Sequence, residues 1–107
     1  MVDIDERSRR SIRACLRALV AFSQAPRDEQ SWNDARTALG TLGDTAGKLL
    51  SRQPREDAAF SSSLTSVYEA AEAMRKTPPP EKAREDLDIA LGDVKYRVKR
   101  LFGIEVR

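Results

Sequence analysis

Three acidic side chains in the second half of the chain have a spacing that can support chemistry. Glu69 and Glu72 stand in the stretch Glu-Ala-Ala-Glu, and Asp93 ends the stretch Ala-Leu-Gly-Asp that begins at Ala90. If both stretches are helical, positions three residues apart lie one turn apart on one face. Carboxylates that face each other on paired helices can hold Mg²⁺, which binds a nucleoside triphosphate and orients an attacking water. This spacing offers one route to catalysis.

Residues 67–104 resemble the MazG-like all-helical nucleotide pyrophosphohydrolases. Those enzymes pair a Glu-x-x-Glu helix with a Glu-x-x-Asp helix that contains a similar Leu-Gly-Asp-Val run. This chain has Ala90 in place of the first acid of the second pair, so one of the four ligands is missing. Glu85-x-x-Asp88 has the spacing but lacks the Leu-Gly context. The resemblance implies a Mg²⁺-dependent pyrophosphohydrolase that is degenerate or inactive, so we predict no catalytic residues, no metal site and no cofactor.

The chain contains no histidine and a single cysteine, Cys15. The first absence excludes Ser/His/Asp and Cys/His triads, zinc sites that need imidazole, and the Glu-x-x-His pairs of di-iron bundles. Cys15 falls on the apolar face of a predicted helix, where we expect a small buried side chain. One cysteine allows no intrachain disulfide, which fits a reducing compartment. No apolar run approaches the roughly 18 residues of a membrane span, and the N-terminus is unlike a secretory signal, so we predict a cytoplasmic protein.

Apolar residues recur at three- and four-residue steps in four segments, which predicts four amphipathic helices. We place them at about residues 5–23, 31–52, 55–76 and 79–102. No alternating strand pattern or internal repeat is present. The sequence therefore predicts an all-α fold: one domain, residues 1–107, forming a four-helix antiparallel (up-down-up-down) bundle.

The expected helix ends follow from local residue types. Ser31 and Asp34 predict a capping box at the start of the second helix. Pro79 suits the first turn of the fourth helix, and Gly103 suits its end. Within the second helix, glycines at positions 40, 43 and 47 lie together. They indicate either a flat strip that another helix approaches closely or a weak, broken helix, since each glycine costs about 1 kcal/mol against alanine.

The formal net charge is only +2, but the basic residues cluster. Arginines and no acids occur from Arg7 to Arg17, and bases dominate after Lys95. Cations near a helix start oppose its dipole, and such a broken local rule suggests function. In an up-down-up-down bundle both clusters lie at the same end, so we expect a basic end and an acidic opposite end. The predicted nucleic-acid-binding residues are Arg7, Arg9, Arg10, Arg13, Arg17, Lys95, Lys99 and Arg100. Alternatively, these charges merely keep the bundle soluble.

Ile89 and Tyr96 are seven residues apart and point away from the apolar stripe of their helix. One exposed apolar residue needs no explanation, whereas two in register suggest a seam with another chain. We predict that this pair forms a protein interface.

Together these patterns favour a non-catalytic small helical subunit or adaptor of a larger assembly. Its expected partners are nucleic-acid backbone, bound without sequence specificity, or an acidic protein surface, and other copies of itself or other subunits. In size, helix content and basic patches the chain is similar in architecture to the small helical subunits of CRISPR effector complexes. The alternatives are the MazG-like hydrolase and a protein–protein interaction module without a nucleic-acid role.

Overall fold

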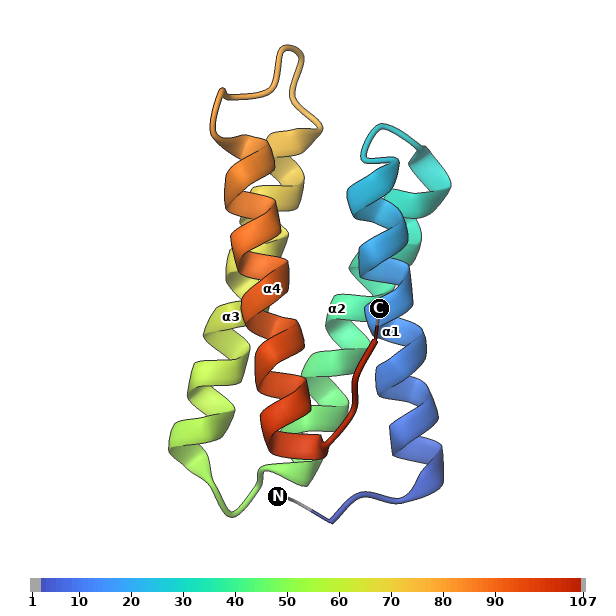
Figure 1. Ribbon diagram of the computed structural model, residues 1–107, viewed down its shortest axis with the longest axis vertical. Coiled ribbons are helices and arrows are strands. Elements are labelled where there is room, and N and C mark those ends of the chain that lie inside the picture. The colour runs from blue at the N-terminus through green and yellow to red at the C-terminus, as the bar shows by residue number, and fades with distance from the viewer. Residues whose placement is uncertain (1–2, 107) are drawn as a thin grey trace.

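The computed structural model describes residues 3–106 and contains four α-helices in this range. They are α1 (Glu6–Gln24), α2 (Glu29–Leu49), α3 (Pro54–Met74) and α4 (Ala83–Phe102). Figure 1 shows them running alternately up and down, with the start of α1 and the end of α4 at the lower end of the molecule. The predicted all-α antiparallel bundle is confirmed. None of the helices in the described range is long and apolar enough to cross a membrane.

The helices pair as two hairpins. α1 packs mainly against α2 and α3 mainly against α4, while smaller contacts join α2 to α3 and α1 to α4. The bundle therefore has four sides, each formed by two neighbouring helices, and the α1/α2 side lies opposite the α3/α4 side (Figure 1). This arrangement decides which charged residues can meet.

The starts of the first two helices are set by aspartate caps. The Asp5 side chain accepts a hydrogen bond from the Ser8 backbone N–H at 3.0 Å, and Asp28 does the same for Ser31 at 2.8 Å. Both bonds satisfy an N–H that has no partner within the helix. Hydrogen bonds from the Ser8 side chain and backbone hold the pKa of Asp5 below its usual value, and those from the Ser31 backbone and side chain do the same for Asp28. The predicted Ser31–Asp34 capping box is wrong, because Asp28 takes the cap and α2 begins at Glu29.

In the second half of the chain, a proline starts α3 and a glycine ends α4. Pro54 occupies the first turn of α3. Pro79 does not start α4, which begins four residues later at Ala83, and the stretch between Met74 and Ala83 forms a loop. Gly103 ends α4 as predicted, with a left-handed φ of 68°, and its N–H bonds to the Lys99 carbonyl at 3.0 Å.

The second helix is continuous through its glycines. A Cβ added at Gly43 would meet Leu64 at an ordinary 3.7 Å, and one added at Gly40 or Gly47 would meet nothing within 4 Å. No neighbouring helix therefore needs glycine at these positions. Both sequence-based interpretations, a close approach and a broken helix, are wrong.

The core contains the predicted apolar stripes of all four helices. Its bulkiest members are aromatic. The rings of Phe60 and Phe102 meet edge to face with their centroids 6.2 Å apart, and the ring centroids of Phe22 and Trp32 are 5.4 Å apart. Cys15 is buried as predicted, and burial raises the pKa of its thiol. After α4 the chain turns back, and Ile104, only 1% exposed, adds its side chain to the core. Figure 1 shows this short C-terminal tail lying between α4 and α1.

Candidate nucleic-acid interface

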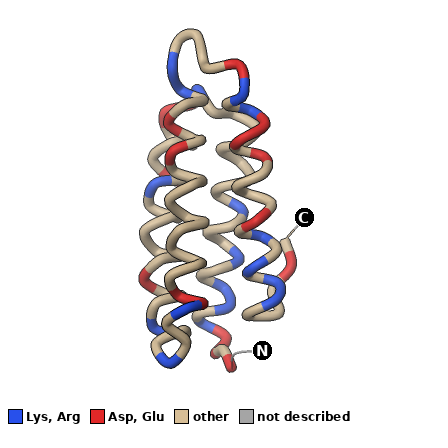
Figure 2. The backbone as a smooth tube through the Cα atoms, turned by 90° about the vertical axis from the view of Figure 1, so that its left-hand side faces the viewer, with Lys and Arg blue, Asp and Glu red and all other residues tan. Residues whose placement is uncertain are grey.

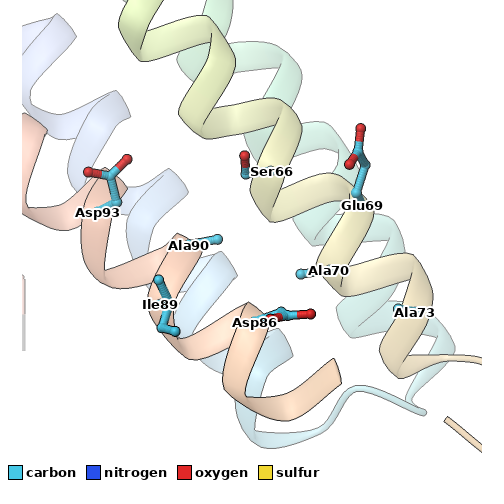
Figure 3. A pocket seen from close by; sticks show the side chains of 8 residues that line it. All are labelled: Ser66, Glu69, Ala70, Ala73, Asp86, Ile89, Ala90 and Asp93. Atoms are coloured by element: carbon cyan, nitrogen blue, oxygen red, sulfur yellow. The ribbon is translucent and has the colours of Figure 1, made fainter. Parts of the chain in front are cut away.

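Of the three predicted carboxylates, Glu69 and Asp93 lie on the α3/α4 side of the bundle, whereas Glu72 lines a separate hollow with Arg75 and Lys76. A groove with a volume of about 550 Å³ opens on the α3/α4 side, lined by Ser66, Glu69, Ala70, Ala73, Asp86, Ile89, Ala90 and Asp93 (Figure 3). Ala90 is 9% exposed and forms part of the groove wall, so the position of the missing carboxylate carries only a methyl group. Figure 3 shows the carboxylates of Glu69, Asp86 and Asp93 set apart from one another. Within residues 3–106, no three acidic or thiol side chains come together in a way that could hold a metal ion.

Asp93 has partners of its own in the bundle. Its carboxylate accepts a hydrogen bond from the Ser63 hydroxyl at 2.5 Å and another from Arg97 Nε at 3.3 Å. The Ser63 bond is the main reason that the pKa of Asp93 lies below its usual value, and Arg97 adds to the effect. The Ser63–Asp93–Arg97 network joins α3 to α4, so Asp93 already has a structural role. Ser63 could not be found from the sequence because it lies thirty residues away along the chain, whereas the four-residue spacing of Asp93 and Arg97 could have indicated their pairing.

Five of the eight predicted basic residues form two rows, one on α1 and one on α4, and the other three lie elsewhere. On α1, Arg9, Arg13 and Arg17 follow at four-residue steps, so they form one row along the helix. On α4, Lys95 and Lys99 form a similar row. That row continues to Arg84, whose guanidinium donates to the Ser23 carbonyl at the end of α1, so it lies on the α1/α4 side. We call these five basic residues of the two rows, Arg9, Arg13, Arg17, Lys95 and Lys99, the α1/α4 basic face.

The remaining three predicted residues lie elsewhere. Arg7 lines a hollow between α1 and α2 together with Lys48. Arg10 pairs with Glu6 one turn earlier at 3.5 Å. Arg100 bonds Glu56 of α3 at 2.9 Å, and this carboxylate raises the pKa of Arg100. The predicted basic end is thus a basic face that follows α1 for about 12 Å, since four residues advance a helix by about 6 Å.

The α1/α4 basic face has few internal counterions. Among residues 3–106, no carboxylate lies within 4.0 Å of the charged nitrogens of Arg9, Arg13, Arg17 or Lys95. Lys99 meets Glu105 of the C-terminal tail at 3.3 Å, but both side chains are 63% exposed, so the pair is weak. Figure 2 shows the contrast along α4, with acidic positions in its upper half and basic positions in its lower half.

The opposite end of the bundle is less acidic than expected. Glu29 pairs with Arg75 at 2.6 Å, and Asp88 pairs with Arg84 at 3.4 Å. Figure 2 shows blue and red segments side by side at the upper end. The loops there carry Arg27, Lys76 and Lys82, which the charge argument from the sequence did not weigh.

The predicted interface residues Ile89 and Tyr96 are both 64% exposed, as their spacing indicated. Ile89 lines the α3/α4 groove, whereas Tyr96 lies in a shallow hollow with Lys95, Lys99 and the tail residues Glu105 and Val106. The sequence analysis missed Tyr68, which is 38% exposed and packs against Trp32 at 5.8 Å.

Three comparisons with known proteins were made, and no family model, curated protein or solved structure matches this chain. Its function is therefore inferred from its own residues, of which the α1/α4 basic face is the most distinctive group.

Proposed function

We propose that the protein is a non-catalytic small helical subunit or adaptor of a larger assembly, which binds nucleic-acid backbone through the α1/α4 basic face. The observation that supports this most is the row Arg9, Arg13 and Arg17, which has no carboxylate partner among residues 3–106. Cations without internal partners keep their charge available for phosphates. Three of them in a row would be costly to maintain if they served only the fold, because they repel one another.

The geometry favours phosphates over bases. The arginine row spans about 12 Å of helix, whereas phosphates follow every 3.4 Å or so along one strand of a duplex, so the row can lie along several of them. Tyr96 is the exposed aromatic side chain next to Lys95 and Lys99, and one ring offers little base stacking. Binding would therefore depend on salt and not on sequence.

A cytoplasmic location, the absence of a cofactor and the presence of further subunits belong to the same proposal. The lone buried Cys15 supports a reducing compartment. The exposed Ile89 and Tyr96 support contact with neighbouring chains.

The test is binding to a mixed-sequence RNA and to a duplex DNA across a salt series. The triple variant Arg9→Gln, Arg13→Gln, Arg17→Gln should bind more weakly, and the slope of log K against log salt should flatten by about 2 to 3, at 0.7 to 0.9 per lost contact. The matched control is Arg27→Gln, Lys76→Gln, Lys82→Gln, which removes the same charge from loops at the opposite end. This control should keep the wild-type slope. If both variants lose the same affinity for nucleic acid, the effect is due to net charge alone. If the first variant binds as wild type, the α1/α4 basic face is not the binding surface.

The MazG-like activity is the second candidate, because Glu69 and Asp93 line one groove. Its test is Mg²⁺-dependent release of pyrophosphate from nucleoside triphosphates. Release that disappears in Glu69→Gln would replace the non-catalytic proposal with the enzyme. If neither nucleotides nor nucleic acids are bound, an acidic protein surface becomes the partner to seek.

A further inference from the structure

The α3/α4 side presents an apolar side chain flanked by acids. Ile89 is 64% exposed and lines the groove together with Asp86 on its own helix and Glu69 on α3 (Figure 3). Neither Glu69 nor Asp86 has an ion-pair partner among residues 3–106. An exposed isoleucine beside two unpaired carboxylates is suited to a partner surface that is hollow and basic.

The opposite side of the bundle carries a surface of that kind. A hollow with a volume of about 380 Å³ lies between α1 and α2, lined by Arg7, Ser8, Ser11, Thr45, Lys48 and Leu49. Its lining includes two cations, small hydroxyl side chains and the partly buried Leu49. Neither Arg7 nor Lys48 forms an ion pair within residues 3–106. The hollow is therefore complementary in charge to the acids beside Ile89, and it offers space for one exposed side chain.

We propose that the partner is a second copy of this chain, with Ile89 of one copy seated in the α1/α2 hollow of the next. Asp86 and Glu69 then face Arg7 and Lys48 of that neighbour. Each copy carries both surfaces, on opposite sides of the bundle, so the contact is heterologous and adds copies in a row. The contact is small, so the association is weak and depends on protein concentration and on salt.

Such a row leaves the α1/α4 side of every copy uncovered. Where successive copies are related by translation without rotation, their basic faces lie along one side of the row and form a longer track for a phosphate backbone. This consequence rests on the proposed function, whereas the association of copies does not.

The experiment is sedimentation of the purified full chain over a concentration series at about 50 mM and about 500 mM salt, with no nucleic acid present. Wild type should associate beyond the dimer at low salt and dissociate at high salt. Ile89→Ser should weaken association about tenfold or more, because it removes the apolar anchor. Tyr68→Ser is the control, since Tyr68 is an exposed aromatic side chain that lines neither the α3/α4 groove nor the α1/α2 hollow, and it should associate as wild type. Helical circular dichroism checks that each variant is folded.

Charge exchange tests the pairing itself. Asp86→Lys and Lys48→Glu should each fail to associate alone, and an equimolar mixture should associate, because every contact in the mixture again joins opposite charges. A monomer at all concentrations at low salt would overturn the proposal. A dimer that is lost in Ile89→Ser but unchanged in Lys48→Glu would overturn it too, because Ile89 would then contact Ile89 of the other copy and not the α1/α2 hollow.

The same samples separate this inference from the proposed function. The Arg9/Arg13/Arg17 glutamine variant should still associate as wild type. If copies associate but bind no nucleic acid, the proposed function is wrong and the association of copies stands. If the protein binds nucleic acid but stays a monomer, the association of copies is wrong and the proposed function stands.

Discussion

The two sides of α4 use charge in different ways. Towards α3, some charged residues of α4 have partners within the bundle: Asp93 accepts from Ser63 and Arg97, and Arg100 pairs with Glu56, whereas the groove acids Glu69 and Asp86 have no ion-pair partner among residues 3–106. Towards α1, the row Arg9, Arg13 and Arg17 has no carboxylate partner within residues 3–106. Charges with internal partners stabilise the fold and are poorly available to a ligand, whereas charges without them are available. On this ground we propose the α1/α4 side as the surface that binds phosphates, although acids on the other side first suggested chemistry.

The largest expected effect is a difference in stability between two isoleucine-to-alanine substitutions, one on each side of α4. Ile104→Ala should lower the free energy of unfolding by about 3 kcal/mol, because Ile104 is 1% exposed and its loss leaves a cavity beside the tail. Ile89→Ala on the α3/α4 side should change it by less than about 0.5 kcal/mol, because Ile89 is 64% exposed. Urea unfolding of both variants measures the difference. Similar values would mean that the tail does not hold the α1/α4 side together.

A smaller effect tests whether Asp93 is structural. Asp93→Asn should cost about 1 kcal/mol at neutral pH, a value kept low because the carboxylate is 43% exposed. Since the pKa of Asp93 is lower in the folded state, its contribution is present above about pH 4 and is lost as the pH falls through the folded pKa.

The stability difference between wild type and Asp93→Asn should therefore shrink in acid. Thermal unfolding between pH 7 and pH 2.5 follows it, and Glu69→Gln on the same groove serves as the control with little change at either pH. A constant difference across this range would show that the charge of Asp93 does not matter to the fold.

The smallest effect concerns α2, where an added methyl group meets open space. Gly47→Ala should raise the free energy of unfolding by about 0.5 to 1 kcal/mol, because alanine restricts the unfolded chain and favours the helix. Nucleic-acid binding should stay the same. This variant would give a stabilised background for comparing changes on the two sides of α4, and a loss of stability would revive the close-approach interpretation of the glycines.

The helices and the core were predictable because apolar residues spaced at three and four residues are the ones that a helix buries. Ile12, Leu16 and Leu19 recur at helical steps, and the structure buries all three. Helix starts were harder, because a cap depends on which of several polar residues takes the N–H groups: Asp28 does so, and Ser31 does not. Pro79 similarly suited the start of α4 by its residue type, but the helix begins at Ala83.

The candidate surfaces were only partly predictable. The four-residue steps of Arg9, Arg13 and Arg17 place them in one row, so their common side was available from the sequence. Whether a charge has a partner was not, because Arg100 meets Glu56 from forty-four residues away. The opposite positions of Arg7 and Arg9 follow from the hundred-degree turn per residue, but which helix lies on each side follows only from the fold.

The measurement that tests the central claim most directly is the salt dependence of RNA and DNA binding by wild type and by the Arg9/Arg13/Arg17 glutamine variant. Wild-type binding should weaken steeply as salt rises and should not depend on nucleotide sequence, and the slope of log K against log salt should be flatter by about 2 to 3 for the variant. Wild-type binding that ignores salt, or a variant with an unchanged slope, would contradict the account.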